Sequence, residues 1–432
     1  MVAKSRTATP PPATSRAAEK AVPSKEPAKE FGGAPGAVFI MVSSHLLLFL
    51  MTASLYGSSL SLYAPTPKTL LWVLGYHLSQ YLCARFMPGV EVPGQTGLGY
   101  LCNGYSTLWA TMAGVGSLHA AGVLDLTDLV HEFPAFLSTV IIIANIYAVY
   151  WHFTYAVEGG RFKEDFFDVY KFFIGLGVHP RFGIVDVKMV AETRISWTLL
   201  FLLTLGSYIE AARRLDTWLN PVGFMVLAHG LYANACAKGE HFIPYTWDIT
   251  TEAFGWMLCW WNVAGVPMLY CYQSLFLAHH AWSGLVVPMP AIYYPVITAL
   301  LVGAYCIWDQ ANYHKCYFKM YMRGDIIKRR LFPTFPHVEE PKYIKCDAGV
   351  LLIDGWYGWA RKIHYTADTS MALLWGLSCG FSSPLPYVYF GFFVAMITHR
   401  AGRDEERCRH KYGETWDKYL KAVPYRFIPG VY

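Results

Sequence analysis

Apolar stretches of about twenty residues recur along most of this chain, and they constrain its fold more than any other feature. As an α-helix, such a stretch is long enough to cross the hydrocarbon core of a bilayer. Only 15% of the 432 residues are charged, against roughly 25% in soluble domains. The pattern predicts an all-α, polytopic membrane protein and excludes an ordinary soluble enzyme. Eight stretches cover residues 37–57, 69–86, 100–124, 136–156, 196–213, 218–236, 254–278 and 289–308.

A ninth apolar stretch, residues 371–398, is interrupted in its middle by the sequence Ser-Ser-Pro-Leu-Pro at 382–386. Proline removes a backbone donor and breaks a helix, so this stretch suits two short helices or a re-entrant hairpin better than one straight span. The whole chain is therefore predicted to contain about ten transmembrane helices. We expect a disordered cytosolic tail over 1–36, a membrane domain over 37–308 and a C-terminal part over 309–432.

The positions of the basic residues predict how the chain crosses the membrane. Of the 35 Lys and Arg residues, 28 lie in four blocks, at 1–36, 157–195, 309–350 and 399–432. An even number of spans separates successive blocks, so all four lie on one side, and basic loops favour the cytosol. Both termini are therefore predicted to be cytosolic. Arg213 and Arg214 would be lumenal and form the one discordant pair.

Several classes of function are excluded by what the sequence lacks. A net charge of +5 is too small to indicate nucleic-acid binding. The chain has no P-loop, no glycine-rich Rossmann turn after a strand and no histidine spacing typical of di-iron or zinc enzymes, so we expect no metal site. The ten cysteines form no C-x-x-C pair and are predicted to be reduced.

Two polar segments follow the eighth apolar stretch. Asn312, Lys315 and Lys319 recur at helical spacing and line one helix face just past the membrane, although snorkelling interfacial lysines would give the same pattern. Residues 355–368 combine aromatic and charged side chains, which an interfacial aromatic belt would also show. Each segment taken alone therefore has a structural explanation beside the functional one.

The C-terminal segment, residues 399–419, is the third polar segment. Arg400 and Asp404 lie four residues apart, so they could form an ion pair on one helix face. Charges at the end of a broken span are costly unless they are paired or face a wet cavity. Guanidinium groups bind phosphate oxygens, and aromatic faces stack on rings. Together the three segments predict a membrane-embedded, cytosol-open site for an anionic cofactor.

Two signatures carry a family resemblance. Residues 399–432 are HRAGRDEERCRHKYGETWDKYLKAVPYRFIPGVY, and residues 167–175 are FDVYKFFIG, followed by His179-Pro180-Arg181. They resemble the sterol reductase family, which includes the sterol 14-reductases, 7-dehydrocholesterol reductase, the lamin B receptor and the fungal 24(28)-sterol reductase. The family usually has Asn-Pro-Arg where this chain has His179. The similarity spans roughly residues 100–432.

Two further blocks are most similar to the 24(28)-reductase branch of the family. They are NACAKGE at 234–240, followed by Thr-Trp-Asp at 246–248, and GWMLCWWNVAGVP at 255–267. The 14- and 7-reductases carry Gly-Asp and Trp-(Val/Leu)-Pro in the second block, where this chain has Trp261-Asn262 and Gly265-Val266-Pro267. Sterol 14- or 7-reduction remains an alternative.

The resemblance implies NADPH as cofactor, a sterol from the bilayer as substrate and the endoplasmic reticulum membrane as location. His364 stands where many members have Asn. The NADPH-binding residues that the resemblance implies are Lys315, Lys319, Trp356, Arg361, His364, Tyr365, Asp368, Arg400, Arg403, Asp404, Lys411 and Tyr412.

The implied reaction is the reduction of an isolated alkene, the 24(28)-methylene bond of an ergosterol-type sterol. Such a bond is not polarised, so an acid must protonate it before hydride can add. Protonation of the terminal methylene carbon leaves the more stable, tertiary cation at carbon 24, and NADPH delivers hydride to that carbon. Our hypothesis for the acid is Asp404, with Tyr412 as a tyrosine relay.

Two other classes of protein compete with this interpretation. An isoprenylcysteine-type membrane methyltransferase has a similar C-terminal Tyr-Gly and Pro-Gly region, but it would leave the 167–175 and 234–240 segments unexplained. A non-catalytic sterol-binding scaffold, like the receptor member of the family, would carry a folded N-terminal domain, whereas this tail has about 36 low-complexity residues. The sequence predicts neither protein partners nor an oligomeric state.

Overall fold

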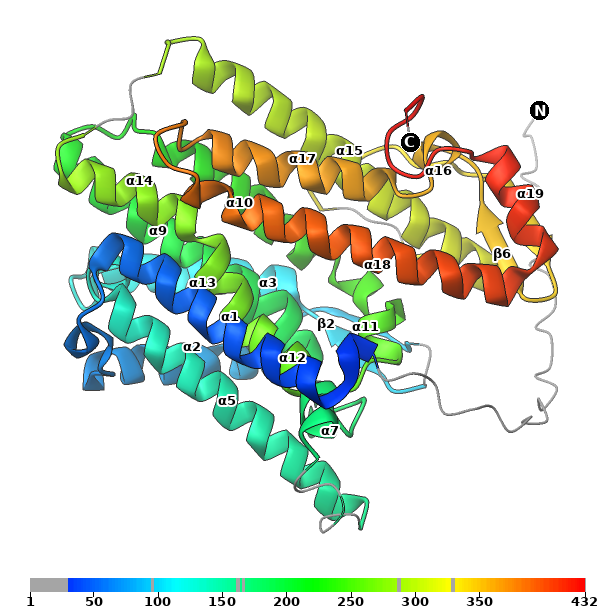
Figure 1. Ribbon diagram of the computed structural model, residues 1–432, viewed down its shortest axis with the longest axis horizontal. Coiled ribbons are helices and arrows are strands. Elements are labelled where there is room, and N and C mark those ends of the chain that lie inside the picture. The colour runs from blue at the N-terminus through cyan, green and yellow to red at the C-terminus, as the bar shows by residue number, and fades with distance from the viewer. Residues whose placement is uncertain are drawn as a thin grey trace, which may run out of the picture.

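The computed structural model describes residues 30–94, 97–160, 164, 168–285, 289–327 and 331–431. Most of the described residues are helical, and the long helices pack against one another in one helical body (Figure 1). Three short antiparallel hairpins, which the sequence did not predict, join strands β1–β2, β3–β4 and β5–β6. Residues 1–29, most of the predicted tail, and Phe167 of the family signature lie outside the described residues.

The N-terminal half contains ten helical segments and four strands among its described residues. They are η1 (Glu30–Gly32), α1 (Gly33–Tyr56), η2 (Leu60–Tyr63), α2 (Pro67–Phe86), β1 (Val90–Val92), β2 (Tyr100–Cys102), α3 (Gly104–Ala120), α4 (Asp128–His131), α5 (Phe133–Glu158), α7 (Val169–Ile174), β3 (Arg181–Phe182), β4 (Val185–Asp186), α8 (Val187–Met189) and the π-helical η3 (Val190–Ile195).

The C-terminal half begins with α9, which continues η3. Its elements are α9 (Ser196–Leu215), α10 (Val222–Lys238), η4 (Glu240–Tyr245), α11 (Trp247–Thr250), α12 (Trp256–Trp260), the π-helical η5 (Trp261–Gly265), α13 (Val266–Tyr270), α14 (Tyr272–Trp282), α15 (Tyr293–Arg323), β5 (Tyr343–Cys346), β6 (Gly349–Leu352), α16 (Trp356–Trp359), α17 (Ile363–Leu377), η6 (Leu385–Tyr387), α18 (Val388–Tyr412) and α19 (Glu414–Ala422).

Three helical stretches of the described chain are long and apolar enough to cross a membrane by length and composition. They are Glu30–Tyr56, Phe133–Glu158 and Val187–Leu215. Other predicted spans are helical but shorter, interrupted or more polar. The structure is therefore that of a helical protein with candidate membrane spans, and the number of spans stays a prediction.

The predicted span over 100–124 begins with a strand. Tyr100–Cys102 is β2, and the helix α3 starts only at Gly104. The amide of Asn103 donates to the carbonyl oxygens of Cys83, Ala84 and Met87, which satisfies the C-terminal end of α2. Asn103 therefore serves the free carbonyl groups at the end of α2, and α3 begins only after it.

The predicted span over 254–278 is likewise not one straight helix. The π-helical segment η5 separates α12 from α13, and Pro267, the second residue of α13, lies two residues after it. Proline has no backbone N–H to donate and its ring crowds the preceding turn, so the regular hydrogen-bond ladder cannot run through it. An added Cβ at Gly265 would lie 2.5 Å from the ring of Trp261, so this bend needs glycine.

The 167–175 signature and the 255–267 block touch through their glycines. Gly175 has a φ of +95°, and an added Cβ there would lie 2.3 Å from the backbone nitrogen of Gly255. An added Cβ at Gly255 would lie 2.1 Å from the backbone nitrogen of Gly175. Phe254 also donates a backbone hydrogen bond of 2.7 Å to Gly177. Segments 80 residues apart are thus in backbone contact, which only glycine permits.

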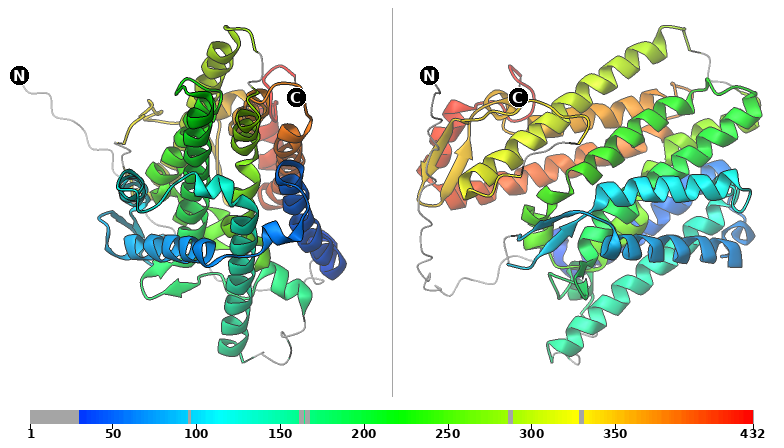
Figure 2. Two further views of the ribbon diagram at one scale, coloured as in Figure 1. Left: turned by 90° about the vertical axis from the view of Figure 1, so that its left-hand side faces the viewer. Right: turned by 180° about the vertical axis from the view of Figure 1, so that it is seen from behind.

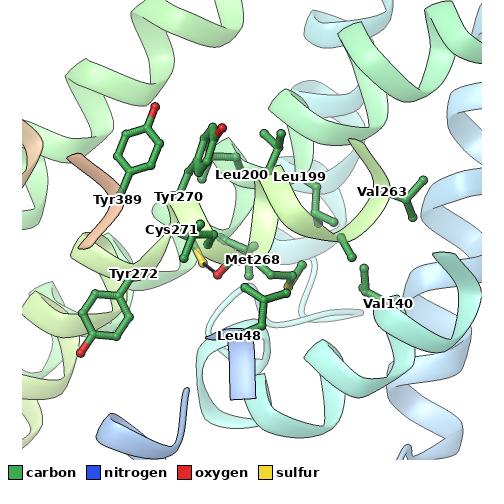
Figure 3. Packing of buried hydrophobic residues seen from close by; sticks show 14 of the residues in the cluster. Leu48, Val140, Leu199, Leu200, Val263, Met268, Tyr270, Cys271, Tyr272 and Tyr389 are labelled. Carbon is green, nitrogen blue, oxygen red and sulfur yellow. Dashed lines mark hydrogen bonds between the residues drawn. The ribbon is translucent and has the colours of Figure 1, made fainter. Parts of the chain in front are cut away.

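One large apolar core joins the helices. Figure 3 shows Leu48 of α1, Val140 of α5, Leu199 of α9, Met268 of α13 and Tyr389 of α18 converging on it. Helix α15 packs against α17, and α17 against α18. At one end of this group lie β6, α16 and α19, as Figures 1 and 2 show from opposite sides. The polar C-terminal segments therefore gather at a single end of the helical body.

Candidate active site

Three helices bring the predicted charged residues together at that end. Helix α15 carries Lys315 and Lys319, Lys362 directly precedes α17, and α18 carries Asp404. Lys362 and Asp404 form a salt bridge, and Lys315 interacts electrostatically with both. We call these four residues the cationic cluster. The structure thus assembles three separate segments of the sequence into one group.

Lys315 lies beyond the apolar stretch 289–308. Burial lowers the pKa of Lys315 to about 7, and repulsion by the ammonium groups of Lys362 and Lys319 adds to this effect. Its Nζ atom lies 5.7 Å from the ring centre of Tyr357. Because three lysines face one carboxylate, the cluster has an excess of positive charge that a bound anion would balance.

Asp404 is poorly placed to be the acid that the sequence suggested. Burial alone would raise its pKa, but the Lys362 ammonium group, with Lys315 and Arg407, lowers the pKa of Asp404 below its ordinary value. The carboxyl group is therefore held in its ionised form, which accepts hydrogen bonds and cannot donate a proton. This environment suits a residue that organises cations around an anionic ligand.

The two arginines beside Asp404 have other partners. The predicted ion pair between Arg400 and Asp404 does not form. Instead, Nη2 of Arg400 lies 3.3 Å from a carboxylate oxygen of Asp248 in α11. Arg403 pairs with Glu30 at the start of the described chain, and its guanidinium lies 5.5 Å from the ring centre of Phe31. Arg400 keeps 51% of its side chain exposed and remains available to a ligand.

Arg361 holds the C-terminal segment. Its guanidinium donates to the carbonyl oxygens of Val423 and Pro424 at 2.8 and 2.7 Å. It also pairs with Glu405 at 3.0 Å. These bonds use most of its donors, so the structure gives Arg361 a role in positioning the C-terminal segment against α17 and α18.

Lys411 and Tyr412 lie in the last turn of α18, about two turns beyond Asp404. The Tyr412 ring stacks on Trp416 of α19, with ring centres 6.4 Å apart. Eight residues separate Asp404 from Tyr412, which is about 12 Å along a helix. This separation does not support the predicted proton relay from Asp404 through Tyr412.

Trp356, His364 and Tyr365 form the aromatic side of the same end. The indole of Trp356 donates to Gln310 at 2.9 Å. His364 and the hydroxyl of Tyr357 are hydrogen-bonded at 3.1 Å, and burial lowers the pKa of His364, so its imidazole is neutral. The His364 and Tyr365 rings lie 4.2 Å apart. These rings offer flat surfaces beside the lysines.

Asp368 is separated from the charged residues. Its carboxylate oxygens accept hydrogen bonds from the hydroxyl of Tyr232 at 3.2 and 3.3 Å. Asp368 precedes the apolar stretch 371–398, and burial raises its pKa to about 7, although hydrogen bonds from Tyr232 and Trp308 oppose this rise. The carboxyl group therefore retains a proton near neutral pH.

Aromatic rings surround Asp368. Tyr232 stacks against Trp197 at 4.3 Å and against Trp308 at 4.6 Å between ring centres. Tyr270 and Tyr389 lie 4.2 Å apart, side by side in Figure 3. We call these five residues the aromatic cluster. They come from α9, α10, α13, α15 and α18, and Asp368 interacts electrostatically with both Tyr270 and Tyr389.

Helix α17 connects the two clusters. His364 and Asp368 are four residues apart and Tyr365 and Asp368 are three apart, so all three lie toward one side of the helix. Lys362 begins the same helix as its N-cap. An anionic group bound at the cationic cluster would therefore lie next to the surface that leads to Asp368.

The cavities recorded among the described residues lie elsewhere. One is lined by Tyr100, Asp186, Arg194 and neighbours, and one by Leu215, His280 and neighbours. The cytosol-open cofactor pocket therefore stays a prediction.

Sequence reasoning missed several residues of this site. Lys362 lies in the aromatic and charged segment 355–368, and its position beside Arg361 was the available signal. Tyr232 and Trp197 lie inside apolar stretches, where an aromatic residue gives no functional signal of its own. Asp248 was part of the Thr-Trp-Asp block, but nothing in the spacing paired it with Arg400, which is 152 residues away.

The chain is similar over most of its length to known proteins. The model of the ergosterol biosynthesis ERG4/ERG24 family matches residues 29–432. A Delta(24(24(1)))-sterol reductase, erg4A, from Aspergillus fumigatus is 38% identical over 93% of this chain and 92% of that protein. A Delta(24(24(1)))-sterol reductase from Gibberella zeae is 39% identical over 85% of this chain and 63% of that protein.

A more distant relative comes from a bacterium. The Delta(14)-sterol reductase of Methylotuvimicrobium alcaliphilum is 31% identical over 84% of this chain and 82% of that protein. All three of these relatives are sterol reductases, and the matches extend over 84–93% of this chain. The chain belongs to the ergosterol biosynthesis ERG4/ERG24 family.

Proposed function

We propose that this protein is an oxidoreductase that uses NADPH to reduce a carbon–carbon double bond of a sterol. The observation that carries the proposal is the juxtaposition, along α17, of a cationic cluster with an aromatic cluster. A phosphorylated cofactor needs cations, and a sterol needs an apolar, aromatic surface. The two clusters lie next to each other, so one protein could bind a phosphorylated cofactor and a sterol side by side.

The residues present fit a phosphorylated nicotinamide cofactor. Lys315, Lys319 and Lys362 supply charge for phosphate, and the exposed guanidinium of Arg400 adds a bidentate donor. The rings of Trp356 and Tyr365 supply stacking surfaces. When bound, NADPH supplies hydride. The chain's own tasks are to orient the two partners, exclude water and provide a proton.

The bond reduced is the 24(28)-methylene bond, which the two fungal relatives number 24(24(1)). Those relatives are 38% and 39% identical, whereas the bacterial Delta(14)-sterol reductase is 31% identical. Reduction at carbon 14 is therefore the second candidate. The family match over residues 29–432 weighs against a methyltransferase of the isoprenylcysteine type.

The protein acts in the endoplasmic reticulum membrane, in this proposal, with about ten spans and both termini in the cytosol. The domain limits predicted from the sequence, at residues 36 and 308, belong to the same proposal. Support comes from the three apolar helices long enough to span a bilayer and from the gathering of β6, α16 and α19 at one end. This orientation gives the cationic cluster access to cytosolic NADPH.

An assay of the full-length protein tests the proposal. Membranes containing it would be incubated with NADPH and, separately, with 24(28)-, 14- or 7-unsaturated sterols, and the products read by mass spectrometry. We expect a gain of two hydrogens on the 24(28)-unsaturated sterol. Reduction of the 14-unsaturated sterol alone would instead support the second candidate function, reduction at carbon 14. Turnover with S-adenosylmethionine, and none with NADPH, would contradict the proposal.

A further inference from the structure

Asp368 and Tyr232 form a carboxyl–phenol pair with an unusual symmetry. The Tyr232 oxygen lies 3.2 Å from one carboxylate oxygen of Asp368 and 3.3 Å from the other. When the carboxyl group carries a proton, one of its oxygens can donate to the phenol while the other accepts from it. Such an arrangement lets a proton leave Tyr232 as another arrives from Asp368.

The surroundings favour the protonated, uncharged form of this carboxyl group. Among the described residues, no lysine, arginine or histidine forms a salt bridge with Asp368. The groups that face it are Tyr232 of α10, Tyr270 of α13, Trp308 of α15 and Tyr389 of α18, all neutral near pH 7. A carboxyl group that lacks a paired cation keeps its proton more readily than one in a salt bridge.

The aromatic cluster also suits the charge that protonation of an alkene creates. Ring faces attract a nearby cation, most strongly in indoles. Trp197 and Trp308 lie against the two sides of Tyr232, at 4.3 and 4.6 Å between ring centres. A tertiary carbocation formed next to the Tyr232 hydroxyl would lie among these faces and away from bulk water.

We propose that Tyr232 is the proton donor of the reduction and that Asp368 is the acid that resupplies it. The inference rests on the proposed function and replaces Asp404 as the acid. The π electrons of the alkene form a bond to the Tyr232 proton at the methylene carbon, while the Asp368 proton moves to the Tyr232 oxygen. The cation at carbon 24 then receives the two electrons of the cofactor's hydride. Solvent returns a proton to Asp368.

A phenol alone is too weak an acid for this step, with an ordinary pKa of about 10. Asp368 acts through Tyr232, so it is a positioning residue with respect to the substrate. Substitution of either residue should therefore slow the same proton transfer. A double variant should reduce the sterol only slightly more slowly than either single variant.

The experiment compares Asp368→Asn, Tyr232→Phe and the double variant with wild type in nanodiscs. Single-turnover reduction should slow by about 100-fold to 10,000-fold in each, while the NADPH dissociation constant changes by less than about 2-fold. The matched variant Asp404→Asn should instead weaken NADPH binding. Melting temperatures identify any variant that fails to fold.

Infrared spectroscopy gives a readout that does not depend on turnover. Wild-type protein at slightly acid pH should show the carbonyl stretch of a protonated carboxylic acid, and Asp368→Asn should lack that band while Asp404→Asn keeps it. Absence of an Asp368-dependent band would overturn the inference even in an active protein. Wild-type single-turnover rates in both Asp368→Asn and Tyr232→Phe would also overturn it. A wild-type protein that shows the band but reduces no sterol would overturn the proposed function instead.

Discussion

Two aspartates of the C-terminal part differ in protonation because of their neighbours. Asp404 pairs with Lys362, which keeps its pKa below the ordinary value, whereas burial among aromatic rings raises the pKa of Asp368 to about 7. Both residues lie in polar segments that the sequence analysis identified, Asp368 in 355–368 and Asp404 in 399–419. Their charge states depend on partners from α10 and from the start of α17, which spacing along the chain does not reveal.

The sequence identified the right segments but paired some residues wrongly. Helical spacing suggested that Arg400 bonds Asp404, yet Arg400 reaches Asp248. An i, i+4 pair contributes only about 0.3–0.5 kcal/mol, so a tertiary partner easily replaces it. Local spacing is therefore a reliable guide to which residues share a helix face, and a poor guide to their ionic partners.

The discordant lumenal arginines have a structural explanation. Arg213 pairs with Asp125 at 2.7 Å, and Arg214 pairs with Glu210 at 2.7 Å. Glu210 also accepts hydrogen bonds from Trp282 and lies near His131. Each of the two arginines therefore has a structural role in an ion pair.

Lys315 makes a pH-dependent prediction. Its pKa of about 7 means that it is protonated below neutral pH and loses its charge above it. NADPH affinity of the wild type should therefore fall as pH rises from about 6 to about 8.5, because only the protonated amine attracts phosphate. The Lys315→Arg variant stays charged and should bind NADPH with little pH dependence. Fluorescence titration of NADPH across this range measures the effect.

The control for this prediction is Lys68→Ala. Lys68 pairs with Asp128 and Glu132 between α2 and α4, outside the cationic cluster. Its removal should leave the NADPH affinity and its pH dependence as in wild type. A wild-type affinity that does not change with pH would contradict the role given to Lys315.

At the scale of elements, the NACAKGE block at 234–240 serves as a structural junction. Lys238 pairs with Asp309 of α15 at 2.7 Å, and Glu240 pairs with Arg194 of η3 at 2.7 Å. Glu240 also accepts a hydrogen bond from the backbone of Gly104, the first residue of α3. The block therefore holds α3, η3, α10 and α15 together, which gives it a structural role.

Breaking the Lys238–Asp309 pair should destabilise the protein. Both side chains are buried, with 0% and 2% exposed, so Asp309→Ala leaves a buried ammonium group without its carboxylate. We expect a loss of about 3–5 kcal/mol. The matched control is Asp417→Ala, which removes the partner of Arg409 in a pair that is 63% and 64% exposed and should cost less than about 1 kcal/mol. Thermal or denaturant unfolding in detergent compares the two, and equal effects would contradict this account.

The sequence predicted the long helices better than the interruptions between them. Apolar length located α1, α5 and α9 because these helices are apolar along most of their length, although only 17% of the apolar part of α1 is buried, against 56% for α5. The strand β2 and the π-helical η5 arise from tertiary demands, namely the carbonyl groups that Asn103 satisfies and the ring of Trp261 against Gly265. Apolar stretch length contains no information about either.

For the whole molecule, the basic blocks were the most informative sequence feature. Their distribution predicted that the hydrophilic C-terminal segments share one side, and the structure places β6, α16 and α19 at one end of the helical body. The resulting arrangement separates a charged end from an aromatic interior, with α17 running between them. Sequence pattern could not reveal that interior, because its rings come from five helices.

The central claim is that protonation from the aromatic interior and hydride transfer from the charged end reach different carbons of one bond. Isotope labelling of the reduced 24(28)-unsaturated sterol tests it most directly. With deuterated NADPH in ordinary water, the account predicts deuterium at carbon 24. With ordinary NADPH in deuterium oxide, it predicts deuterium at carbon 28. Deuterium from the cofactor at carbon 28, or from solvent at carbon 24, would contradict it.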